Sequence, residues 1–168
     1  MSRLVNTLKK SFKKMIERNW DTVYIFVDMH ETVMEPTWNS IPSVKLYPMA
    51  LDTLKLMSEH ENIKLILWSS SLPHINLEYQ KLFKESGVIF SAINSNPFEK
   101  DTEYADFTTK PYISLILDDK AGFVPVSDWS PLYDYMVMIK ALAFIKAITT
   151  NDAKNFLFNL KINQKYGF

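Results

Sequence analysis

The sequence lacks cysteine altogether and contains only three glycines among its 168 residues. Without cysteine there are no disulfides, no thiolate metal sites and no cysteine nucleophile. With so few glycines a glycine-rich phosphate loop is not available, so any phosphate must be held in another way. The absence of cysteine fits a reducing compartment, and we expect a cytoplasmic protein.

The sequence also has no excess of either charge and no long apolar run. Nineteen basic side chains balance nineteen acidic ones, so the overall charge points to neither a nucleic-acid partner nor a membrane partner. No apolar run is long enough to cross a bilayer, and we expect no membrane partner. The length favours one domain over residues 1–168, with a core of ordinary size.

The first 20 residues have the pattern of an amphipathic helix, with leucines on one face and lysines around it. A basic amphipathic helix can lie on a membrane or on nucleic acid. It can also dock on its own domain and leave its lysines in water. Docking is the commoner role for such a helix.

Apolar, β-rich segments then alternate with helical patterns through the rest of the chain. This alternation predicts a three-layer, Rossmann-like α/β fold, with a parallel sheet and helices on both faces. We expect a core over residues 22–126 and C-terminal helices over residues 127–168. The expected strands are residues 23–27, 63–68, 88–93 and 113–117, with a short last strand near 123–126; the expected helices begin at Pro48 and cover residues 73–86, 133–149 and 152–160.

Polar side chains stand at the C-terminal ends of three of the expected strands. Asp28 ends the first, Ser69 ends the second, and Asp118 and Asp119 end the fourth. In open parallel sheets ligands bind beyond these ends, so the side chains should meet in one crevice. Lys110 lies shortly before the fourth strand, from where its ammonium can reach the same crevice.

Each of these residues has an ordinary structural role open to it. A strand-end aspartate or serine often caps a helix or closes a turn, and a lone lysine is usually solvated. Together they suggest more. Converging carboxylates repel each other unless a hard cation such as Mg²⁺ neutralises them. A hydroxyl and an ammonium can hold a phosphoryl group, and an aspartate can attack phosphorus to give an aspartyl phosphate.

The order of these residues resembles the motifs of the haloacid dehalogenase superfamily. That family has an apolar strand followed by Asp-x-Asp-x-Thr, then a strand ending in Ser or Thr, then a lysine, then a strand ending in acidic residues. The matching segments here are VYIFV-Asp28-Met29-His30-Glu31-Thr32, LILW-Ser69-Ser70-Ser71, Thr109-Lys110-Pro111 and LIL-Asp118-Asp119. The resemblance covers roughly residues 22–126.

The resemblance implies a role for each matching residue. Asp28 is implied as the nucleophile, and Ser69, Ser70, Lys110 and Thr32 as phosphate or substrate ligands. Mg²⁺ is implied as the cofactor, held by Asp28, the backbone carbonyl of His30, Asp118 and Asp119. The implied activity is hydrolysis of a phosphomonoester.

One position departs from the family pattern, because His30 replaces the second aspartate of the first motif. In phosphatases of the family that aspartate is the general acid and base. A histidine can do both, since its ordinary pKa suits neutral pH. The alternative is a catalytically impaired binding or regulatory protein that kept the scaffold.

Neither gap between the motifs holds a separate cap domain, so we expect an open site. Family members with open sites often act on large substrates or close the site by oligomerising. A nucleotide, a polynucleotide end, a phosphosugar and a phosphoprotein all remain open as substrates, and a homodimer remains open as the assembly. Trp38, in the loop after the first motif, is a candidate for stacking on a base or sugar.

Overall fold

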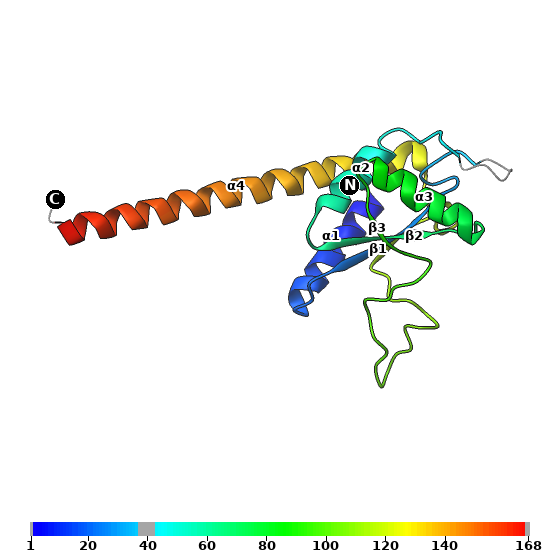
Figure 1. Ribbon diagram of the computed structural model, residues 1–168, viewed down its shortest axis with the longest axis horizontal. Helices are drawn as coiled ribbons and strands as arrows, with labels where there is room; N and C mark the ends of the chain where they lie inside the picture. The colour runs from blue at the N-terminus through cyan, green and yellow to red at the C-terminus, as the bar shows by residue number, and fades with distance from the viewer. Residues whose placement is uncertain (1, 37–42, 167–168) are drawn as a thin grey trace.

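The structure is a computed structural model that describes residues 2–36 and 43–166, with side chains as far as residue 150. Its centre is a four-stranded sheet in the order β3-β2-β1-β4, and every neighbouring pair is parallel. The strands are β1 (Val23–Asp28), β2 (Ile63–Trp68), β3 (Phe90–Ile93) and β4 (Leu115–Leu117). Figure 1 shows the sheet beneath a group of helices.

β1 lies inside the sheet because its side chains are apolar on both faces. Val23, Ile25 and Val27 join the main core, while Tyr24 and Phe26 join a second cluster on the opposite face. Successive side chains of a strand point to opposite faces, so a continuous apolar run suits a strand covered on both sides. The register pairs Asp28 with Trp68 on β2 and Val27 with Leu117 on β4.

All four helices contribute to the main core. They are α1 (Arg3–Glu17), α2 (Ala50–Glu59), α3 (Pro73–Glu85) and α4 (Pro125–Tyr166). α1 docks through Leu4, Val5 and Leu8, which are buried, and leaves Lys10, Lys13 and Lys14 exposed. Its amphipathic pattern therefore serves the domain's own core.

The opposite face of the sheet is covered differently. Its cluster of Tyr24, Phe26 and Ile66 packs against Trp68 and Tyr112. Tyr112 belongs to the crossover segment, residues 94–114, in which the structure has no helix. This segment extends from the sheet on the side away from the helices (Figure 1). The predicted α/β fold, a parallel sheet flanked by helices, is confirmed; the layer on this face is irregular chain.

The end of the chain corrects the sequence prediction. Residues 123–126 are not a strand, because α4 begins at Pro125, and the two expected C-terminal helices are one helix of 42 residues. Proline suits a first helical turn, and the Asp128 carboxylate accepts a hydrogen bond from the Val124 amide at that end, 2.8 Å long. Residues 132–166 contain neither glycine nor proline, so nothing in the sequence breaks the helix.

α4 extends well beyond the body of the domain (Figure 1). Near the body, Trp129, Leu132 and Met136 are buried in the core. Further along, residues 140–150 are exposed. Within the described ranges, no helix combines the length and apolarity that crossing a membrane requires.

Candidate functional site

Thr32 joins the first and fourth motifs at the C-terminal end of the sheet. Its hydroxyl donates to Asp28 Oδ2 at 3.1 Å and accepts from the Asp119 amide at 3.0 Å. Its carbonyl accepts from Trp129 Nε1 of α4 at 2.9 Å. Thr32 is fully buried, so these bonds are shielded from water. The expected phosphate ligand Thr32 therefore positions the carboxylate of Asp28 and the loop after β4.

Asp28 is held in a position that disfavours its charge. The pKa of this carboxyl is raised from 3.8 to about 6. Burial is the largest cause, and the nearby negative charges of Asp118 and Asp119 also contribute. The hydrogen bonds from Thr32 and the Met29 amide oppose this shift. A carboxylate that is partly desolvated and faces two like charges is typical of a functional position.

Asp118 and Asp119 follow β4 and differ in what they contact. Asp118 Oδ1 accepts from the amides of Lys120 and Ala121, which makes it the cap of the short 3₁₀ helix at Asp119–Ala121. Asp118 Oδ2 has no hydrogen bond among the described residues, which leaves it available to a ligand. Asp119 pairs with the ammonium of Lys120.

Lys120 is a candidate that the sequence analysis missed. Its ammonium contacts Asp119 Oδ2 and lies 3.2 Å from Glu31 Oε2, in the first motif. These two carboxylates raise the pKa of Lys120 above its ordinary value. The only sequence signal was its place directly after the acidic pair, which reads equally well as a solvated lysine.

Ser69 follows the end of β2, as predicted, but its hydroxyl bonds the neighbouring Ser71. Ser69 Oγ accepts from the Ser71 amide at 3.1 Å and lies 3.0 Å from Ser71 Oγ. The Asn94 side chain bonds both backbone groups of Ser69. Ser70 is exposed. Ser69 thus lies next to the site at the end of β2 and helps to close the turn before α3.

His30 points toward α3. Its Nε2 lies 2.9 Å from Tyr79 Oη, and that oxygen also accepts from the Ser43 amide at 3.2 Å. Because the buried Tyr79 hydroxyl already accepts from Ser43, its own proton is best satisfied by His30 Nε2. Burial lowers the pKa of His30, so the neutral ring predominates at neutral pH. Among the described residues His30 makes no hydrogen bond to Asp28.

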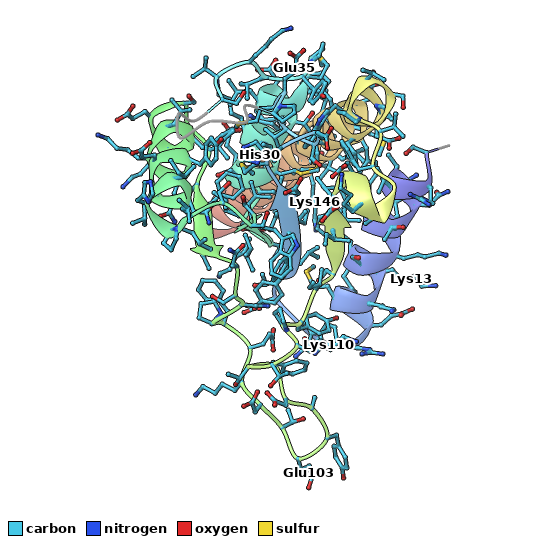
Figure 2. All side chains as sticks on the ribbon, turned by 90° about the vertical axis from the view of Figure 1, so that its right-hand side faces the viewer. Lys13, His30, Glu35, Glu103, Lys110 and Lys146 are labelled. Atoms are coloured by element: carbon cyan, nitrogen blue, oxygen red, sulfur yellow. The ribbon has the colours of Figure 1, made fainter. Side chains whose placement is uncertain are left out.

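Among the described residues, no hydrogen bond or ion pair joins Lys110 to the carboxylates of the candidate site. Lys110 lies on the crossover segment, which leaves the sheet on the side away from the helices, whereas His30 lies on the helical side (Figure 2). Lys110 is exposed. Lys110 therefore makes no direct polar contact with Asp28, and Lys120 is the lysine that pairs with Asp119. Trp38 lies outside the described residues.

Among the described residues, the carboxylates of the candidate site do not form a closed metal site. Within residues 2–36 and 43–166, no group of three or more His, Cys, Asp or Glu side chains is arranged to hold a metal ion. The repulsion of Asp28 by Asp118 and Asp119 nevertheless fits a hard cation with oxygen ligands, because such a cation would relieve it.

Comparison with known proteins gives one informative match. No protein-family model matches the chain, and no curated protein matches it. A solved structure of a conserved protein from Bacteroides thetaiotaomicron is 30% identical, with a TM-score of 0.54, and the match covers 71% of this chain and 92% of that one. That protein is described without an activity. On this identity and coverage, the chain belongs to the same family as the conserved Bacteroides protein.

Proposed function

We propose that the protein is a magnesium-dependent phosphomonoester hydrolase that acts through an aspartyl phosphate on Asp28. The observation that carries the proposal is the half-buried carboxylate of Asp28, whose charge is opposed by burial and by Asp118 and Asp119. An enzyme gains from such a group because binding a cation, or forming a bond to an electrophile, neutralises the disfavoured charge. The resemblance to the haloacid dehalogenase superfamily supports the same assignment.

In the proposed reaction an oxygen of Asp28 attacks phosphorus, and the bond from phosphorus to the substrate's ester oxygen breaks. The departing oxygen takes up a proton. Water then attacks the aspartyl phosphate, releasing inorganic phosphate and restoring the Asp28 carboxylate. Mg²⁺ held by Asp28, the His30 carbonyl, Asp118 and Asp119 would supply neutralisation of the phosphoryl oxygens.

The remaining residues have supporting roles in this proposal. Thr32 holds Asp28 in place, and Lys120 balances the negative charge beside Asp119. Ser69 and Ser70 lie at the neighbouring strand end, where a phosphoryl oxygen can be bound. Lys110 belongs to the proposal on sequence grounds alone.

Hydrolysis of p-nitrophenyl phosphate with excess Mg²⁺ tests the proposal. We expect turnover that falls about 100-fold or more when the metal is chelated, because the carboxylates then repel the phosphoryl group. Added Mg²⁺ should restore the rate. Glu35→Gln is a control, since Glu35 pairs on the surface with Lys45 and should leave the rate unchanged. A rate that is indifferent to chelation contradicts the metal.

A second candidate function is a non-catalytic binding or regulatory protein. The contact of His30 with Tyr79 favours it, because that contact draws the expected acid–base group away from Asp28. The two candidates differ in one measurement. If no substrate of a broad phosphate panel turns over and beryllium fluoride, a phosphate mimic, does not attach to Asp28, the enzyme proposal fails and the binding protein remains.

We also propose that the protein forms a homodimer through α4. Val137, Met138, Leu142, Phe144, Ile145 and Ile148 are all more than 40% exposed. At 3.6 residues per turn these positions fall on one broad face of the helix, with Lys140 and Lys146 at its margins. An isolated helix is only marginally stable in water. A second copy of this chain presents the same apolar face and brings no opposing charges to it.

Sedimentation velocity tests the dimer. We expect a dimer at micromolar concentration and a shift to monomer in Ile145→Glu, because a buried carboxylate in the helix pair is costly. Leu77→Glu is the matched control, since Leu77 is 59% exposed on α3, and α3 lies on the body of the domain away from the projecting part of α4 (Figure 1). A wild-type chain that stays monomeric over the whole concentration range contradicts the dimer.

A further inference from the structure

A cavity of about 320 Å³ lies between the end of the sheet and the crossover segment. Its size is within the usual range for small-molecule sites. Trp68 of β2 forms its wall on the sheet, and the crossover segment forms the other walls. The lining residues from that segment are Asn94, Ser95, Asn96, Pro97, Glu99, Phe107, Thr108, Thr109 and Pro111.

The cavity adjoins the candidate site through two contacts. Trp68 is the register partner of Asp28, so the two residues are neighbours across β1 and β2. The Trp68 ring packs edge-on against Phe26, with centroids 5.4 Å apart. Because side chains alternate along a strand, Asp28 points to the same face as Phe26. The second contact is Asn94, which lines the cavity and bonds the backbone of Ser69.

The walls of the cavity suit a flat ring. Trp68 and Phe107 supply aromatic faces, and Pro97 and Pro111 supply apolar sides. Several of the polar walls are already satisfied within the protein. Asn96 bonds the Tyr112 carbonyl and the Phe98 amide, and Thr109 bonds Asp106.

Two further features of the cavity limit which ligands it can accept. The indole N–H of Trp68 has no hydrogen-bond partner among the described residues, so it can donate to a ring nitrogen or oxygen. Glu99 is a lining residue, and its negative charge disfavours a second anionic group on the ligand. The cavity therefore suits a ring that carries a hydrogen-bond acceptor and has no negative charge.

We propose that this cavity binds the heteroaromatic ring of the substrate, so that the substrate is a ring-bearing phosphomonoester such as a nucleoside monophosphate. The proposal rests on the proposed function for the phosphoryl end, and on the cavity alone for the ring. Trp68 connects the two, because it forms the cavity wall next to the strand that carries Asp28.

The test compares adenosine 5′-monophosphate with ribose 5-phosphate, which has the same phosphate ester but no base. Phe107→Ala should lower kcat/KM for the nucleotide about 10-fold, since base–aromatic stacking contributes ~1–3 kcal/mol. It should change the value for ribose 5-phosphate less than about twofold. Trp68→Phe keeps an aromatic ring but removes the indole N–H. It should lower kcat/KM for the nucleotide only. Phe98→Ala is the matched control, because Phe98 is on the same segment, stacks on Tyr24 and does not line the cavity.

Calorimetric titration with adenosine, which has no phosphate, separates the two proposals. We expect binding that Phe107→Ala weakens about 10-fold and Phe98→Ala leaves unchanged. If adenosine binds in this way but no phosphate ester turns over, the proposed function fails and the ring site stands. If esters turn over but both substrates have equal kcat/KM, or if adenosine does not bind, the ring site is overturned.

Discussion

Replacing Asp28 with asparagine is expected to abolish hydrolysis of phosphate esters and, at the same time, to stabilise the folded protein. The amide cannot form the aspartyl phosphate, so we expect kcat to fall about 1,000-fold or more, as it does when a nucleophile is removed. The replacement is nearly isosteric and keeps an oxygen that can accept from Thr32. Steady-state assays of the purified variant with p-nitrophenyl phosphate measure the loss.

The gain in stability follows from the raised pKa of Asp28. Its value of about 6 in the folded protein lies above the ordinary 3.8. Between these values the folded state binds more protons than the unfolded state, so stability falls as the pH rises from about 4 to about 6. Asparagine carries no charge and lacks this dependence. Without added metal, Tm of the variant should exceed that of the wild type at pH 7.5, and the difference should shrink toward pH 4.

Asp128→Ala is the control for this pair of effects. Asp128 caps α4 by accepting from the Val124 amide, away from the proposed chemistry. Its loss should cost about 1 kcal/mol of stability and leave the rate nearly unchanged. If Asp28 were only a turn or cap residue, Asp28→Asn would behave like Asp128→Ala. A less stable but active Asp28→Asn protein therefore contradicts both the nucleophile and the electrostatic argument.

The strands were predictable because burial on both faces leaves a continuous apolar run. Residues 23–27 and 63–68 were expected as strands, and the structure has Val23–Asp28 and Ile63–Trp68. The error at residues 123–126 has the same origin. Phe123 is buried, and an apolar run of that length reads as a strand although Pro125 begins a helix. Apolarity reports burial, and it specifies the element only where length and flanking residues agree.

The meeting of Asp28 with Asp118 and Asp119 was also predictable, because parallel strands bring their carboxyl ends to one edge. The position of Lys110 was not predictable from the sequence. It precedes β4 by only a few residues, but the crossover segment has no periodicity that fixes which side of the sheet it takes. The contact of His30 with Tyr79 joins the first motif to α3, and such a contact depends on how the helix packs. The sequence therefore identified the backbone frame of the site better than its side-chain partners.

His30→Ala is expected to impair substrates in proportion to how much their leaving group needs a proton. If His30 is the general acid, its loss should lower kcat about 100-fold for an alkyl phosphate, whose leaving oxygen is strongly basic. For p-nitrophenyl phosphate, whose leaving group departs without help, the effect should stay within about threefold. His74→Ala is the control, because His74 is exposed on α3. Equal losses on both substrates would instead indicate a structural role through Tyr79.

The pH profile of the alkyl phosphate reaction makes the same test independently. Asp28 must be ionised to attack, and bound Mg²⁺ would favour the ionised form, so the rate should rise with pH through a value below the metal-free pKa of about 6. His30 must be protonated to act as an acid, and burial lowers its pKa, so the rate should fall as pH rises through a value below 6.5. The optimum should therefore lie in acidic solution, between the rising and the falling limb. His30→Asp replaces the imidazole and should change the falling limb; if rate and profile match the wild type, His30 takes no part in the proton transfer and only contacts Tyr79.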